Sequence, residues 1–254
     1  MTASKRGNRD RCRHASPKVV IVATSAYGGM VTHHYANALA ATAVALAERG
    51  SGVILAAGQS GSLIQTSRNL LVAELLASPI ATHILWIDAD IGWQAADVLR
   101  LLAHDVDVIC GLYPKKQPEL EFPAYPDQPA RVYRHGDLER MPLTFAGMGF
   151  MLVRRCVYER MAAHYPEAKI LPVPGVEPVG GWRRYCNFHS TVSLATGEPI
   201  GEDQGFCERW RAMGGQIWCD PHIRLIHYGQ HGWTVSVMDT LTIEAEEAPA
   251  AGVA

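Results

Sequence analysis

Two aspartates directly after an apolar stretch are the residues of this sequence best suited to chemistry. Residues 83–87 read His-Ile-Leu-Trp-Ile, which predicts a buried strand, and Asp88 and Asp90 follow with one residue between them. Two carboxylates this close repel each other, and burying them without a partner is costly, so a cation would stabilise the pair. A divalent cation held by one or two carboxylates usually takes its other ligands from water and phosphate oxygens. The pair therefore predicts a metal site that binds a diphosphate, with capping of the following helix as the alternative.

A second acidic pair, Glu202 and Asp203, stands at the start of an expected helix. Acids in a first helical turn interact favourably with the helix dipole, so capping can explain this pair as well. The functional interpretation makes Asp203, or Glu202, a general base that takes a proton from an acceptor hydroxyl.

His227 is the third candidate, because it follows two short expected strands and precedes a plausible turn at Tyr228-Gly229. A single histidine in such a place is more often structural than a ligand. A neutral imidazole can nevertheless complete a Mn²⁺ or Mg²⁺ shell that carboxylates begin. We therefore predict Asp88, Asp90 and His227 as metal ligands.

The elements that must position these residues alternate regularly in the first half of the chain. Strands are expected at 18–24, 53–57, 83–87 and 106–110, and helices at 31–49, 67–77 and 94–103. This alternation indicates an α/β fold with a Rossmann-like, mostly parallel sheet flanked by helices. Ligands of such sheets bind outside the carboxyl ends of the strands, where Asp88 and Asp90 are expected.

The second half contains more loops. Residues 113–129 hold five prolines and predict a long irregular segment, and residues 166–193 predict another one that carries several aromatic residues. Loops of this kind are usually attached either to the core or to a ligand. Short strands are expected at 132–133, 143–145, 151–153, 216–218 and 223–226, and helices at 154–164 and 202–213.

Composition narrows the functional classes. The chain has 254 residues and a formal net charge of −2, so it can bury a full core and carries no general basic field for nucleic acid. Residues 1–16 predict a disordered basic leader, with contact to a polyanion as the alternative, and residues 239–254 predict a flexible tail. No apolar run has the length of a transmembrane segment. The six cysteines lack zinc-ligand spacing, so we expect free thiols and a cytoplasmic location.

Together, the motifs resemble the nucleotide-sugar-dependent glycosyltransferases of the GT-A type over about residues 18–233. Among these enzymes the chain resembles family 2, and around Arg68-Asn69 and the acidic strand it is also similar to a fungal family of mannosyltransferases. The resemblance rests on five segments: 67–71, 86–91, 147–155, 201–210 and 227–229.

The resemblance implies a GT-A fold and a set of site residues. Asp88, Asp90 and His227 would hold the Mn²⁺ or Mg²⁺ that bridges the diphosphate of a UDP- or GDP-linked sugar, and Asp203 would be the base of an inverting transfer, with retention left open. The residues implied for donor binding are Thr24, Ser25, Tyr27, Gln65, Arg68 and Asp88. Those implied for acceptor binding are Gly147, Met148, Gly149, Trp182, Phe188 and His189. A single domain at 17–238 would comprise a nucleotide-sugar-binding half at 17–111 and an acceptor half at 112–238.

Two other functions stay open. A sugar nucleotidyltransferase would use the same sheet and acids, although the loop after the first strand, residues 25–29, contains neither Lys nor Arg. A non-catalytic module that binds a nucleotide or carbohydrate would tolerate Asp203→Asn. The acceptor also stays open between a glycan, a protein and a hydroxymethylated base in DNA.

Overall fold

The computed structural model describes residues 17–58, 63–168, 187–229 and 232–240. Its centre is a mixed sheet in the strand order β2-β1-β3-β9-β5-β10-β8-β6, with β7 paired to β8 at the side. The bounds are β1 Val19–Ser25, β2 Gly52–Gly58, β3 His83–Ile87, β5 Val108–Cys110, β6 Ala124–Pro126, β7 Tyr133–His135, β8 Leu138–Ala146, β9 Phe150–Arg154 and β10 Ile217–Cys219.

Strand direction in this sheet changes at β9. Strands β2, β1 and β3 are parallel, and β10 is parallel to β5, whereas β9 runs antiparallel between β3 and β5. The expected helix-flanked α/β sheet is therefore confirmed. Because β9 comes from the second half of the chain and lies between two strands of the first half, the two halves share one sheet.

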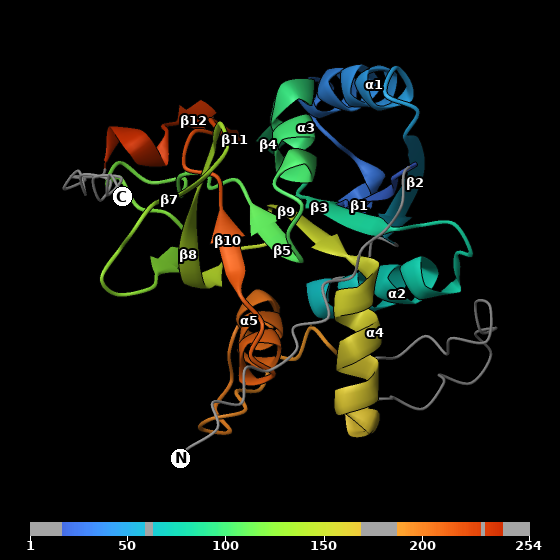
Figure 1. Ribbon diagram of the computed structural model, residues 1–254, viewed down its shortest axis with the longest axis vertical. Coiled ribbons are helices and arrows are strands. Elements are labelled where there is room, and N and C mark those ends of the chain that lie inside the picture. The colour runs from blue at the N-terminus through green and yellow to red at the C-terminus, as the bar shows by residue number, and fades with distance from the viewer. Residues whose placement is uncertain (1–16, 59–62, 169–186, 230–231, 241–254) are drawn as a thin grey trace, which may run out of the picture.

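Five helices cover the two faces of the sheet within the described residues (Figure 1). Helices α1 (His33–Ala47) and α3 (Ala95–Ala103) lie on one face, and α2 (Ile64–Ala77), α4 (Arg155–His164) and α5 (Glu202–Ala212) lie on the other. Strand β3 contributes side chains to the cores on both faces of the sheet, because successive side chains of a strand point to opposite faces. Ile84 and Trp86 pack on the α2 side, and Leu85 and Ile87 pack on the α1 side.

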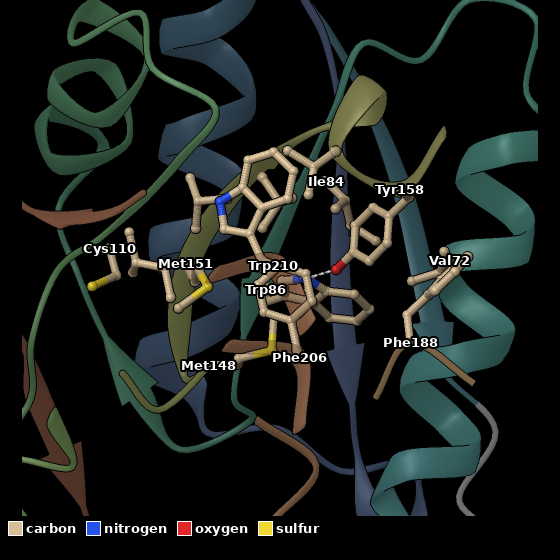
Figure 2. Packing of buried hydrophobic residues seen from close by; sticks show 14 of the residues in the cluster. Val72, Ile84, Trp86, Cys110, Met148, Met151, Tyr158, Phe188, Phe206 and Trp210 are labelled. Atoms are coloured by element: carbon tan, nitrogen blue, oxygen red, sulfur yellow. Dashed lines mark hydrogen bonds between the residues drawn. The ribbon is translucent and has the colours of Figure 1, made fainter. Parts of the chain in front are cut away.

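The larger core lies beneath α2, α4 and α5. Figure 2 shows Trp86 of β3 against Tyr158 of α4, where the indole Nε1 donates a hydrogen bond of 3.1 Å to the tyrosine hydroxyl. Both side chains are almost completely buried, at 1% and 0% exposure. This packing satisfies the polar atoms of both rings, and it anchors the strand that ends at Asp88.

A second, smaller sheet of order β12-β11-β4 stands at the carboxyl end of β3. Its strands are β4 (Ile91–Gly92), β11 (Ile226–Tyr228) and β12 (Gly232–Thr234), and His227 pairs with Ile91 across β11 and β4. Short 3₁₀ helices at Tyr27–Gly29, Pro166–Ala168 and Val237–Asp239 complete the elements of the described residues. The β4–β11 pairing brings two distant parts of the chain together directly beside Asp90.

Some boundaries differ from the predictions. The strand expected at 223–226 begins only at Ile226, and β4, β6 and β12 were not predicted. The predicted leader and most of the predicted tail lie outside the described residues, but Asp239 belongs to the fold because its carboxylate accepts a 2.7 Å hydrogen bond from Arg224. None of the described helices combines the length and the apolar composition needed to cross a membrane.

The expectation of free thiols is correct for three cysteines and wrong for one. Cys110, Cys207 and Cys219 are free and buried, where burial raises the pKa of each thiol. Cys156, in the first turn of α4, is disulfide-bonded. Local spacing gave no sign of this bond, because pairing of cysteines depends on tertiary proximity.

Candidate active site

The candidate site lies where the strand order of the main sheet reverses. The chain passes from β1 to β2 on one side and from β3 to β5 on the other, so the carboxyl ends of β1 and β3 flank the reversal. Open α/β sheets bind ligands in the crevice at such a point. Ser25 ends β1 and Asp88 follows β3, in agreement with the sequence-based placement of the acidic pair.

Arg68, in the second turn of α2, lies at the centre of this site. Its Nη2 donates to Asp88 Oδ1 at 3.2 Å, and its Nε lies 3.2 Å from Glu202 Oε1 as an ion pair without hydrogen-bond alignment. The guanidinium also lies 5.4 Å from the centre of the Trp86 ring. Only 4% of the Arg68 side chain is exposed. Arg68 therefore joins the acids of β3 to those of α5, and the prediction that it reaches a donor phosphate gains no support from this geometry.

Burial and neighbouring charges shift the pKa of Asp88, which follows β3. Burial raises the pKa of Asp88, the Arg68 charge lowers it, and Asp90 and Glu202 raise it further. The side chain is nevertheless 31% exposed, so one part of the carboxylate contacts Arg68 and another part faces solvent. Asp88 is therefore held in place by Arg68 while remaining accessible to a ligand.

Glu202 and Asp203 form the first turn of α5, after Gly201 at the N-cap. Glu202 is engaged by Arg68, whereas the Asp203 carboxylate accepts backbone N–H groups, that of Gln204 at 2.7 Å and its own. Burial and the neighbouring Glu202 charge raise the pKa of Asp203. Asp203 is thus a half-buried carboxyl with a raised pKa and no ion pair among the described residues, whereas Glu202 is paired with Arg68.

Asp90 lies beside His227 and Lys116. The Lys116 ammonium contacts Asp90 Oδ2, and His227 Nε2 lies 3.7 Å from Oδ1. The other ring nitrogen, Nδ1, lies 2.9 Å from the Pro114 carbonyl oxygen. A carbonyl oxygen can only accept a hydrogen bond, so Nδ1 carries a proton, and Nε2 is the ring nitrogen that faces Asp90.

The three predicted metal ligands are only partly brought together. No group of three or more His, Cys, Asp or Glu side chains forms a metal-binding cluster among the described residues. Asp88 is held by Arg68, whereas Asp90 and His227 present an oxygen and a nitrogen ligand to the same space. Their chemistry suits Mn²⁺ or Mg²⁺, which are commonly bound by few protein ligands and completed by substrate phosphates.

The predicted donor-binding residues lie around the ends of β1 and α2. The Ser25 and Ser67 hydroxyl groups are 2.9 Å apart, and the buried Thr24 hydroxyl contacts that of Tyr35. Gln65 is half-buried in the first turn of α2. Tyr27 lies in the 3₁₀ helix after β1. Ser25 thus lies beside Ser67 of α2, and the Thr24 hydroxyl is already hydrogen-bonded within the protein.

Gly147 and Gly149 have a packing role that the sequence did not reveal. A Cβ atom at Gly149 would lie 2.5 Å from Tyr113 Cζ, and one at Gly147 would lie 2.8 Å from the same tyrosine's hydroxyl oxygen. Met148 between them is 1% exposed, and its carbonyl lies 3.4 Å from Arg68 Nη1, which donates to it. The close approach that these glycines allow is that of Tyr113, so their assignment to an acceptor site gains no support from this packing.

The predicted aromatic acceptor wall is also mostly internal. Phe188 and His189 are both 0% exposed, and His189 stacks on Phe206 at a ring distance of 5.3 Å. Burial, together with the nearby Arg68 charge, lowers the pKa of His189 well below its usual value. Asn69 holds this segment by accepting the His189 backbone N–H at 3.1 Å. Trp182 lies outside the described residues.

Two residues at the site were missed by the sequence analysis. Tyr113 accepts the Gly149 backbone N–H at 3.1 Å, and burial beside Asp88 raises its pKa well above the usual value. Lys116 contacts Asp90. Both belong to the proline-rich segment 113–129, and the adjacent Lys115-Lys116 pair in a loop after a strand was the one available signal.

Comparisons with known proteins identify the fold. No protein-family model and no curated protein matches this chain. The crystal structure of A197 from STIV matches with a TM-score of 0.50 at 12% sequence identity, covering 93% of this chain and 99% of that one. The shared feature is the fold. A glycosyltransferase involved in glycosylation of the major capsid of PBCV-1 is a more distant match, with a TM-score of 0.32, 12% identity and coverage of 60% and 68% of the two chains.

Proposed function

We propose that this protein is a metal-dependent glycosyltransferase of the GT-A type that moves a sugar from a nucleoside-diphosphate sugar to an acceptor hydroxyl. The observation that carries the proposal is the meeting of two acidic pairs, Asp88 with Asp90 and Glu202 with Asp203, at the carboxyl edge of the sheet. In this proposal, Asp88 and Asp90 would hold the donor, and Asp203 at the start of α5 would be the base.

Charge balance supports a divalent cation at this site. In the described structure, Arg68 and Lys116 are the Lys and Arg side chains in contact with the four carboxylates, so negative charge is in excess even when both cations are counted. A donor diphosphate would add further negative charge. Asp90 and His227 would hold Mn²⁺ or Mg²⁺, which would neutralise the charge that builds up on the leaving diphosphate.

Arg68 and Asp203 would have separate roles in the transfer. Arg68 holds both Asp88 and Glu202 through ion pairs, so the acids of β3 and α5 keep a defined separation. Asp203 would accept the proton of the acceptor hydroxyl as that oxygen attacks the sugar. Its pKa, raised by burial and by Glu202, makes it a stronger base than an ordinary aspartate. In-line attack with such a base implies inversion at the anomeric carbon.

The test is a donor-hydrolysis assay with a panel of UDP- and GDP-linked sugars, with and without Mn²⁺ or Mg²⁺. We expect metal-dependent release of nucleoside diphosphate by the wild type and its loss in Asp90→Asn. Asp203→Asn should keep donor affinity and lose transfer. Folded protein that turns over no donor under any of these conditions would contradict the proposal.

The same experiments separate the competing functions. A nucleotidyltransferase would release pyrophosphate from a nucleoside triphosphate and a sugar phosphate. A binding module would bind nucleotide or sugar equally well with Asp203→Asn and would show no turnover. Glycans, proteins and hydroxymethylated DNA should then be compared as acceptors with the donor that is hydrolysed.

A further inference from the structure

One short segment of the chain, residues 113–116, contacts three separate parts of the candidate site. Tyr113 accepts the Gly149 backbone N–H at 3.1 Å, the Pro114 carbonyl oxygen lies 2.9 Å from His227 Nδ1, and the Lys116 ammonium contacts Asp90. The segment therefore orients His227 and places a positive charge on the carboxylate that His227 faces.

The neighbours of Lys116 hold this segment in a closed loop. The Lys115 backbone N–H donates to the Glu121 carbonyl at 2.8 Å, and the Lys115 ammonium pairs with the Glu121 carboxylate. Gln117 Nε2 donates to the other carboxylate oxygen of Glu121 at 2.9 Å. The side chains of Lys115 and Gln117 both contact Glu121, whereas the Lys116 side chain between them contacts Asp90.

Lys116 is also the accessible cation of the site. Arg68 is 4% exposed and lies against two carboxylates, so a ligand cannot reach its charge without disrupting both contacts. The Lys116 side chain is 34% exposed, and that of its partner Asp90 is 40% exposed. Among the described Lys and Arg side chains that contact the four acids, Lys116 is thus the one a phosphate can approach.

We propose that Lys116 binds the diphosphate of the nucleoside-diphosphate donor and, without donor, acts as the counter-ion of Asp90. This inference rests on the proposed function. A divalent cation at Asp90 and His227 would be repelled by the ammonium until a diphosphate draws that ammonium away. Metal and nucleoside diphosphate would then bind cooperatively, since each removes an unfavourable charge for the other.

The test compares Lys116→Met with Lys115→Met in the full chain. Lys115 is the matched control, because it is the adjacent lysine and its ammonium pairs with Glu121 outside the acid site. Mn²⁺ binding is measured by calorimetry and by the electron paramagnetic resonance signal of free Mn²⁺. UDP and GDP binding is measured with and without Mn²⁺, and circular dichroism confirms that each variant is folded.

We expect Lys116→Met to bind Mn²⁺ about tenfold more tightly than wild type when nucleotide is absent, because a unit charge a few ångströms from the cation is removed. With Mn²⁺ saturating, the variant should bind UDP or GDP about tenfold more weakly, since one phosphate contact is lost. Lys115→Met keeps the Lys115 backbone hydrogen bond and the Gln117 contact to Glu121, which retain the loop, so this variant should match wild type in both measurements.

Two results would overturn the inference: equal behaviour of the Lys116→Met and Lys115→Met variants, or weaker Mn²⁺ binding by Lys116→Met. Asp90→Asn distinguishes this failure from that of the proposed function. If Asp90→Asn binds Mn²⁺ as well as wild type does, the proposed metal site is wrong. The comparison of the two lysine variants for UDP and GDP binding without metal then still decides the role of Lys116.

Discussion

Replacing Arg68 with methionine tests whether its buried guanidinium holds the acidic site together. Arg68 is 3% exposed and lies 3.2 Å from carboxylate oxygens of both Asp88 and Glu202. Removing one partner of a buried ion pair costs about 3–5 kcal/mol, because the remaining charge loses its partner. Water screens part of the Asp88 charge, so we expect the lower half of that range, roughly 3–4 kcal/mol. At about 2–4 °C per kcal/mol, the Tm should fall by roughly 6–16 °C at pH 7.

The stability lost in Arg68→Met should depend on pH. Arg68 lowers the pKa of Asp88 against the effect of burial, so its removal raises that folded-state pKa further above the unfolded value. A carboxyl group with a raised folded-state pKa favours the fold below its unfolded pKa, and this contribution is lost as the pH rises through the folded-state pKa. The difference between Arg68→Met and wild type should therefore be largest at neutral pH and should shrink toward pH 4.

Urea unfolding at pH 7 and pH 4 measures both effects. Arg160→Met is the control, because the 42% exposed Arg160 guanidinium lies away from the four acids, where it stacks on Trp210 at 4.7 Å and pairs with Asp107 at 3.4 Å. We expect a change of about 1 kcal/mol or less for this control, with no comparable dependence on pH. Adding Glu202→Gln to Arg68→Met should recover part of the loss. A loss of equal size at both pH values would refute the electrostatic explanation.

Three further predictions concern single positions. Burial and Glu202 raise the pKa of Asp203, so its charged form opposes folding at neutral pH. Asp203→Asn should therefore raise the Tm measured by scanning calorimetry at pH 7 but not at pH 3. Gly149→Ala should cost about 1–3 kcal/mol in urea unfolding, because its Cβ would lie 2.5 Å from Tyr113 Cζ, and Tyr113→Ala should recover part of this loss. Although burial opposes it, hydrogen bonding to His104 holds the pKa of the fully buried Asp220 below its usual value. Its stabilisation is present above the unfolded pKa and is lost as the pH falls through the folded-state pKa, so Asp220→Ala should cost about 3–5 kcal/mol at pH 7 and less in acid titrations.

The alternation of apolar runs was sufficient to predict the main strands and helices. The apolar run at 18–24 became β1, the run at 83–87 became β3, and the Ala- and Leu-rich stretch at 31–49 became α1. Each of these elements satisfies its own backbone pattern and buries a face that is recognisable from local spacing. The position of β9 between β3 and β5 was not predictable in this way, because strand partners are chosen over long distances along the chain.

For the site residues too, local sequence predicted some positions, and long-range packing decided others. Asp88 and Asp90 could be placed at the carboxyl end of a strand from their neighbours alone. The glycines at 147 and 149 could not be interpreted locally, because the side chain that needs their space, Tyr113, is more than thirty positions away. The resemblance assigns Phe188 and His189 to acceptor binding, but both are buried because they pack against α4 and α5.

By itself, the sequence determined the main strands and helices and the acids that stand at their ends, because hydrophobic periodicity and chain direction are local properties. The tertiary structure alone decided the partners of those acids. Arg68 meets Asp88 across 20 positions, Lys116 meets Asp90 across 26, and Pro114 meets His227 across 113. Charges that are far apart in the chain interact strongly only when folding removes the water between them, so the electrostatics of this site are a property of the folded protein.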